Sequence, residues 1–465
     1  MKQKTNQSRR NFIKTASLAA LGMSAPASAM VQLKALNALM SAPPTMPFGN
    51  YKAMVFVFLH GGNDSFNMLA PKSNTEYGHY ATTRSNLAIP QNDLLGISSN
   101  NYGLHPSLGG VKQMFDDGDL ALLSNIGTLI EPTTVAQYQN GSVPIPVGLF
   151  SHLDQYNHWQ TAHPHMRINK GWGGQIADMI GSTNVNQNIS MNISLGGSNV
   201  FQYGNNTVEF SMNKNGPKLP LYYNSTWGNN IARKELTDSL LYHNYQDPFQ
   251  KTYADTFRSS LEAGLEFEAA INALAPFATT FSTSNISSEM EMIAKTIAAR
   301  SALGFERQIF FVRHGGWDHH DDLLSRHESG MTEVNDALVE FKTVLNEMGV
   351  FNDVTTFVGS EFARTLTSNG NGTDHAWGGN AIVMGGDVVG NQVYGSYPTL
   401  QIGGPQYIDG GVMVPTTATD SLFSELALWY GLLPSDLPTI FPNLGNFHNL
   451  ATISTSNPPL GFLNM

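Results

Sequence analysis

Residues 53–59 read A-M-V-F-V-F-L, and residues 60–64 continue as H-G-G-N-D. An unbroken apolar run that ends at two glycines is typical of a strand buried on both faces, as in a parallel sheet. The same pattern, an apolar run followed by a polar loop, occurs at residues 309–312 and 354–358. We therefore expect these runs to be strands of one buried sheet.

The segments around these runs alternate between short apolar runs and longer helical patterns. Further strands are expected at 120–124 and 381–384, and helices at 151–160, 229–273 (one or two), 287–302, 323–348 and 419–432. Residues 188–210 alternate polar and apolar side chains between glycines, which favours a hairpin or a small antiparallel excursion. This alternation of strand and helix patterns predicts an α/β fold with a mostly parallel central sheet and helices on both faces.

The N-terminus reads as a targeting signal. Residues 8–14 are S-R-R-N-F-I-K, a short apolar run follows at 16–25, and A-S-A at 27–29 fits a cleavage site. The run is too short to span a bilayer, so we predict a twin-arginine signal peptide over residues 1–29. The alternative is a chance arginine pair before an apolar helix. A lead-in at 30–50 and a single α/β domain at 51–465 would follow, outside the cytoplasm.

Composition restricts the chemistry. The 465-residue chain carries 13% charged residues, a net charge of -11 and no Cys. The negative charge argues against a nucleic-acid partner and against an anionic membrane surface. No later segment is apolar enough to span a membrane. Without Cys, any bound metal must be held by His and carboxylates.

The loop after the first apolar run offers Asp64 as a carboxylate ligand, since Gly61 and Gly62 let the backbone turn tightly. The alternative is an ordinary turn residue. The triplet H-G-G also resembles an oxyanion-hole loop, which predicts a G-x-S-x-G elbow elsewhere. The chain contains no such elbow, which disfavours a serine esterase.

Two later loops concentrate acids and histidines. Residues 315–320 read G-G-W-D-H-H, where Asp318 and His320 are spaced to bind one ion; the alternative is a hydrogen-bonded loop cluster. In residues 359–379, Glu361 follows a strand directly and His375 comes later. The alternative for these two is a buried ion pair of Glu361 with Arg364 and a loop histidine.

Ser151 stands before a helical pattern, in F-S-H at residues 150–152. A serine at a helix start lies among free backbone N–H groups, where an anion also binds well. It is a candidate nucleophile activated by a metal. The alternative is an N-cap serine.

These motifs together resemble the sulfatase-like, twin-arginine-exported family known as domain-of-unknown-function family 1501, in the alkaline phosphatase superfamily. The matching motifs, in chain order, are G-G-N-D-S-F-N (61–67), G-L-H-P-S-L (103–108), F-S-H (150–152), G-G-W-D-H-H (315–320), S-E-F-A-R-T (360–365) and G-T-D-H-A-W-G-G (372–379). They extend over almost the whole mature chain.

The resemblance implies an alkaline phosphatase/sulfatase-like fold and a site with one or two divalent ions around a nucleophile. Asp64 resembles the ligand after the first strand, and Ser151 resembles the nucleophile. The implied ligands of the other metal are Asp318, His320 and the late His375. Glu361 occupies the place where many members have an Asp-His pair, a departure that removes an imidazole.

We therefore expect an exported metal-dependent hydrolase of phosphate or sulfate esters, with a small-molecule or polymer-linked substrate. The ion would be zinc, calcium, magnesium or manganese. Ser151 would attack the ester, and Arg364 would hold its non-bridging oxygens. Asp64 and Glu361 would hold a second ion. The alternative is a non-catalytic member that binds an extracellular ligand or partner through the same cleft. The twin-arginine translocase would be a transient partner during export.

Overall fold

The computed structural model describes residues 51–98 and 101–465. A ten-stranded sheet forms its centre, with the strand order β12-β5-β11-β10-β1-β9-β6-β7-β8 and β15 beside β5. The strands of this sheet are β1 (Lys52–His60), β5 (Leu120–Gly127), β6 (Asn192–Ser194), β7 (Phe210–Asn213), β8 (Gly216–Pro217), β9 (Arg307–Gly315), β10 (Val354–Gly359), β11 (Gly379–Gly385), β12 (Val393–Tyr394) and β15 (Thr417–Ala418). The predicted strands at 53–59, 120–124, 309–312, 354–358 and 381–384 all belong to it.

The sheet is mixed but mostly parallel, as predicted. β1 lies between β9 and β10 and is parallel to both. β11 is antiparallel to its neighbours β10 and β5, and β8 is antiparallel to β7. The pairings of β5 with β12 and β15, and of β6 with β7 and β9, are parallel. Two antiparallel steps at β11 leave β5 running in the same direction as β1.

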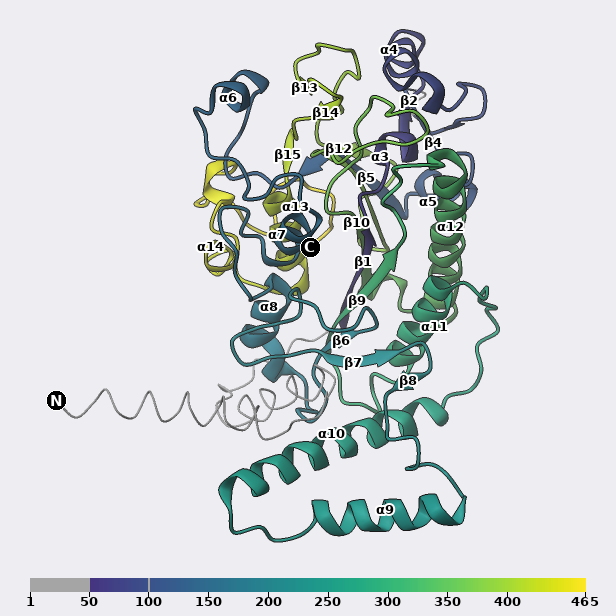
Figure 1. The fold of residues 1–465 in the computed structure, drawn as a ribbon, viewed down its shortest axis with the longest axis vertical. Helices are drawn as coiled ribbons and strands as arrows, with labels where there is room; N and C mark the ends of the chain where they lie inside the picture. The colour runs from purple at the N-terminus through teal and green to yellow at the C-terminus, as the bar shows by residue number, and fades with distance from the viewer. Residues whose placement is uncertain (1–50, 99–100) are drawn as a thin grey trace, which may run out of the picture.

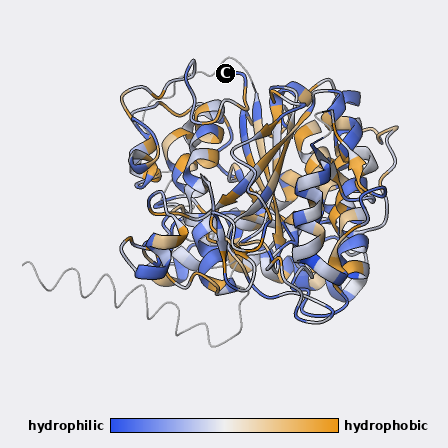
Figure 2. Ribbon diagram, turned by 90° about the horizontal axis from the view of Figure 1, so that it is seen from above, coloured by the Kyte–Doolittle hydropathy of each residue, from blue (hydrophilic) through white to orange (hydrophobic). Residues whose placement is uncertain are grey.

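Helices cover both faces of the sheet (Figures 1 and 2). One layer holds α7 (His152–Thr161), α8 (Trp172–Ile180), α13 (Thr419–Tyr430) and α14 (Leu437–Ile440), and the other holds α5 (Gly109–Asp116), α11 (Asn285–Ala298) and α12 (Leu323–Glu347). On the first face the ring of Phe56 stacks on Phe357 at 4.2 Å between centroids. Trp172 packs on Phe423 of α13 at 4.8 Å. Such aromatic packing buries large apolar areas and holds the helices on the sheet.

Smaller elements surround this core. A three-stranded sheet consists of β2 (Leu69–Pro71), β3 (Leu95–Gly96) and β4 (Tyr102–Leu104), and β13 (Tyr407–Ile408) pairs with β14 (Val412–Met413). The short helices are α3 (Ser65–Met68), α4 (Asn74–Arg84) and α6 (Val135–Asn140), with 3-10 turns η1 (Ser85–Leu87), η2 (Gly181–Thr183), η3 (Phe351–Asp353) and η4 (Leu444–Asn446).

Residues 229–273 form two helices, α9 (Gly228–Leu241) and α10 (Pro248–Asn272). Together they make a helical hairpin that extends from one end of the molecule (Figure 1). The other predicted helices are also present, at α7, α11, α12 and α13. Along the described part of the chain, no helix has the length and apolar character needed to cross a membrane.

The predicted antiparallel excursion over residues 188–210 is wrong. β6 and β7 pair in parallel, and β6 also pairs with β9, which is more than a hundred residues away. The polar residues between them support this path, because the Gln202 side chain donates to the carbonyls of Ile193 (3.0 Å) and Ile309 (2.9 Å). An alternating pattern reports burial and does not identify the partner strand. The predicted signal peptide (1–29) and lead-in (30–50) lie outside the described residues, and the single-domain assignment of 51–465 stays a prediction.

Candidate active site

Three loops meet at the edge of the sheet where the parallel strands β1, β9 and β10 end. The ends lie side by side, since His60 pairs with Gly315 and Phe58 pairs with Gly359. The loops approach closely: a Cβ on Gly61, whose φ is +128°, would lie 2.4 Å from the backbone nitrogen of Asp318. Only glycine fits there. The carboxyl edge of such a sheet is where ligands bind in α/β folds.

At this edge of the sheet, four basic side chains lie around one carboxylate oxygen of Asp318. Its Oδ1 lies 2.7 Å from Nη1 of Arg364 and 2.9 Å from Nε2 of His320. The Nε2 atoms of His375 and His152 lie 3.3 Å and 3.4 Å from the same oxygen. Four basic side chains thus surround one carboxylate, on a partly exposed surface. The sequence-predicted residues Asp318, His320, His375 and Arg364 are brought together here.

Three of these side chains fit a metal ion. His152, Asp318 and His375 each offer a ligand atom, and the three atoms lie within 4.8 Å of one another. Nε2 of His152 is buried and makes no hydrogen bond, although the charged oxygen of Asp318 is near. A buried polar atom without a partner is costly, so the ring is placed for a ligand. Imidazole nitrogens and a carboxylate form a suitable donor set for a divalent cation.

The protonation of His375 and of Asp318 suits a cation as well. Burial lowers the pKa of His375, which favours the neutral imidazole that binds metals. Burial acts to raise the pKa of Asp318, but the hydrogen bond and charge of Arg364 outweigh it, and the net pKa is lowered. At neutral pH the site therefore presents a carboxylate beside a neutral histidine.

Glu361 contacts the ring nitrogen of His152 that faces away from Asp318. Its Oε1 accepts a hydrogen bond from the Gly61 N–H (2.8 Å) and lies 2.9 Å from Nδ1 of His152. The hydrogen bond to Glu361 is the main reason that the pKa of His152 is raised. A carboxylate on the far nitrogen fixes the tautomer and orientation of a ligating histidine. The structure therefore places Glu361 outside the group of three ligand atoms, as the partner of one of them.

His152 is the site residue that sequence reasoning missed. It stands in the F-S-H motif beside Ser151, so the motif marked its position. The pattern around it is that of a helix start, and nothing in that pattern shows that its ring reaches a loop more than 160 residues away.

Asp64 is fully buried and forms an ion pair with Arg84, which is also fully buried. Arg84 donates further to the carbonyls of Thr365 (2.9 Å) and Leu366 (3.2 Å). This pairing ties the first loop to the segment after β10. Within residues 51–98 and 101–465, the structure brings Asp64 and Glu361 into no second group of three metal-ligating side chains.

The guanidinium of Arg364 is held on several sides. It donates to Asp318, to Oγ1 of Thr373 (3.1 Å), to the carbonyl of Thr373 and to the carbonyl of Gly61 (3.3 Å). Its ion pair is therefore with Asp318, and the alternative pairing with Glu361 is not the one observed. Arg364 fixes the two loops that carry the histidines.

Ser151 is the N-cap of α7, and its hydroxyl accepts a hydrogen bond from the Asp154 N–H at 3.4 Å. The loop that carries it contacts the cluster, since Nδ1 of His375 lies 2.9 Å from the carbonyl oxygen of Phe150. The cap alternative is thus present in the structure. It does not conflict with a nucleophilic role, because a cap hydroxyl that accepts a bond keeps its own proton and lone pair.

Residues 230–405 match the family described as "Protein of unknown function (DUF1501)". The match confirms, for this part of the chain, the family that the motifs indicated. Among curated protein sequences, none matches the chain.

Solved structures similar to this chain include an alkaline phosphatase, a sulfatase and a phosphonate monoester hydrolase. Wild-type alkaline phosphatase PafA has 12% identity and a TM-score of 0.30, over 70% of this chain and 64% of that chain. A sulfatase from Pseudoalteromonas sp. has 10% identity and a TM-score of 0.32, over 80% and 68%. A phosphonate monoester hydrolase from Silicibacter pomeroyi has 9% identity and a TM-score of 0.32, over 85% and 77%.

Proposed function

We propose that this protein is an exported, metal-dependent hydrolase of phosphate or sulfate esters. The observation that carries the proposal is the convergence of His152, Asp318 and His375 at the carboxyl edge of a mostly parallel sheet. These three side chains would hold a divalent cation. A bound cation supplies the positive charge that an acidic protein otherwise lacks for binding an anionic ester.

The roles of the other residues follow from their contacts. Arg364 holds the Asp318 loop and contributes a positive charge beside the site, which favours an anionic substrate. Glu361 keeps His152 in one orientation. Ser151, at the N-terminus of α7 and next to His152, is the proposed nucleophile; the backbone N–H groups there favour negative charge on its oxygen.

The metal site is tested by metal content. His152→Ala and His375→Ala should each lower the bound metal of the purified protein, and its melting temperature in metal-containing buffer, since a lost ligand removes binding free energy. His243→Ala, at an exposed histidine after α9, serves as the matched control and should change neither. Equal metal in wild type and both site variants would contradict the site. Ester hydrolysis is then assayed with phosphate and sulfate monoesters and diesters and several divalent ions.

Export belongs to the same proposal and rests on the N-terminal sequence alone. Changing Arg9 and Arg10 together to Lys should leave folded precursor in the cytoplasm, because the translocase reads the arginine pair. Fractionation of cells followed by mass measurement of the N-terminus checks this. Normal processing near Ala29 in the double variant would show that another signal directs export.

A further inference from the structure

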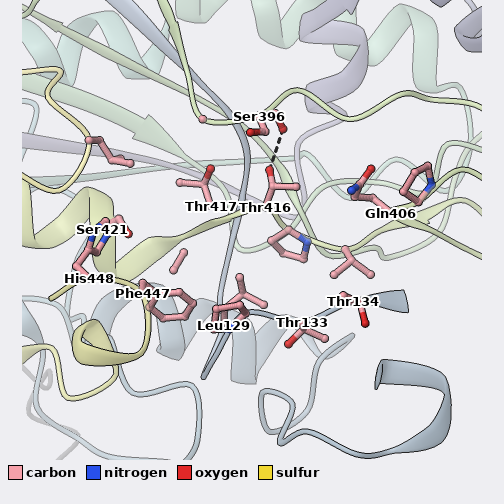
Figure 3. Close-up of a pocket in the computed structure, with 17 residues that line it drawn as sticks. Leu129, Thr133, Thr134, Ser396, Gln406, Thr416, Thr417, Ser421, Phe447 and His448 are labelled. Atoms are coloured by element: carbon pink, nitrogen blue, oxygen red, sulfur yellow. Dashed lines mark hydrogen bonds between the residues drawn. The ribbon is translucent and has the colours of Figure 1, made fainter. Parts of the chain in front are cut away.

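A cavity of about 460 Å³ lies near the ends of β5 and β15, and Figure 3 shows the residues that line it. Asp318 and the four basic side chains around it are not among the lining residues. Leu129, two residues after the end of β5, and Ala418, the last residue of β15, line it. Because β5 runs in the same direction as β1, this cavity and the candidate active site share one edge of the sheet. Cavities of roughly 300–1,000 Å³ are typical of small-ligand sites.

Among the residues that the structure describes, the polar part of the cavity lining carries no acidic side chain, lysine or arginine. Hydroxyl and amide side chains dominate it, including Thr133, Ser396, Gln406, Thr416 and Ser421. An anionic ester group would therefore lack a charged partner here, whereas a neutral ligand with many hydroxyls would find both donors and acceptors.

Some of these groups are free to bind a ligand. The side chains of Gln406 and Ser396 make no hydrogen bond to any residue of the described chain, and both line the cavity. On the opposite side, Oγ of Ser421 lies 2.7 Å from Nε2 of His448 (Figure 3 labels all four). Burial lowers the pKa of His448, which favours the neutral ring; with Nε2 engaged by Ser421, Nδ1 is the ring nitrogen left for a ligand.

The cavity also has apolar surfaces. The ring of Phe447 and the rings of Pro405 and Pro415 contribute flat or rigid faces to its lining. A sugar ring combines hydroxyls at its rim with C–H groups on its faces. Polar side chains that orient a ligand, together with apolar surface that buries it, are the usual composition of a small-molecule site.

We propose that this cavity binds a neutral sugar residue, recognised by Gln406, Ser396 and the Ser421–His448 pair and packed against Phe447. This site is separate from the proposed ester site and does not depend on it. The sugar is either free or part of a glycan, and both sources present the same ring chemistry.

Saturation-transfer NMR on the mature protein tests the proposal, with glucose, galactose, mannose and their trisaccharides as probes and galactose sulfate as the charged counterpart. We expect at least one neutral sugar to bind. Gln406→Ala and His448→Ala should each weaken that binding about tenfold, the usual effect of losing one hydrogen bond. Gln401→Ala changes an exposed residue of the same loop, and His375→Ala changes the proposed metal site. Both variants should leave sugar binding unchanged.

The source follows from the probes: stronger binding of a trisaccharide than of its monosaccharide would indicate a glycan, and equal binding would indicate a free sugar. Four results would overturn the proposal. They are the absence of binding by every neutral probe, equal loss in Gln406→Ala and Gln401→Ala, loss in His375→Ala, and a preference for galactose sulfate.

Discussion

Glu361 shows how a single side chain can serve a site without facing it. Its hydrogen bond to Nδ1 of His152 is the largest cause of the raised pKa of that histidine. Glu361→Gln keeps the shape but removes the charge, so the pKa of His152 should fall. Metal affinity should fall about 10–100-fold, the usual cost of losing such a support. NMR titration of the metal-free protein and metal-binding measurements check both effects. Glu333→Gln, beside His314, is the control, and an unshifted His152 would refute the role.

Ser151 allows its two roles to be separated by a matched pair of variants. Ser151 caps α7 and Ser284 caps α11, each by accepting a hydrogen bond from the N–H three residues on, at 3.4 Å and 3.2 Å. Each change to Ala should cost about 1 kcal/mol of unfolding free energy. If Ser151 is the nucleophile, only Ser151→Ala should also abolish ester turnover. Full activity in Ser151→Ala would reject the nucleophile and leave the cap.

At the scale of elements, α13 carries an acid in an unusual setting. Burial raises the pKa of Asp420, in the first turn of α13, from 3.8 to about 8, and the backbone N–H groups of Asn443 and of Asp420 itself oppose this only in part. The folded state therefore favours the protonated acid. The stabilisation is complete below about pH 4 and is lost as the pH rises to about 8.

Asp420→Asn should remove this pH dependence. The variant should match wild type near pH 4 and exceed it near pH 8 by a few kcal/mol, since one pKa unit corresponds to about 1.4 kcal/mol. Urea unfolding at both pH values measures the difference. Asp93→Asn, at an exposed carboxylate, is the control. A variant less stable than wild type at pH 8 would show that the carboxylate is charged and satisfied in the fold.

The predictability of the elements depended on where their partners lie. Long apolar runs such as residues 53–59 are buried on both faces, so their sequence alone identifies them as inner strands. β6 is only three residues long and derives its register from β9, which its own sequence does not show. Loops that follow inner strands were predicted as the site because strand ends meet at one edge. The sequence does not predict the orientation of each loop side chain. Asp64 points into the protein and pairs with Arg84, and His152, the first residue of helix α7, reaches Asp318.

For the whole molecule, stability should be uneven. α9 contributes one buried residue, Leu241, whereas α12 contributes nine. The second half of α10 differs from α9, because Ala263 and Phe267 join the main core. Local opening follows the number of buried apolar contacts, so amides of α9 should exchange with deuterium at least about tenfold faster than those of α12. Hydrogen-exchange mass spectrometry measures this, and equal protection of the two helices would show that the hairpin is covered in solution.

The antiparallel placement of β11 has a consequence for how this molecule can change over evolution or in the laboratory. Because β11 runs against β10, the chain leaves the sheet after Gly359 and returns at Gly379 on the same edge. The excursion between them carries Glu361, Arg364 and His375, and it never crosses a face of the sheet. Insertions and deletions in its outer part, such as residues 368–371, can therefore be tried in libraries while the strand register stays intact. Such libraries would show whether this excursion sets the specificity of the proposed ester hydrolysis, without redesigning the scaffold.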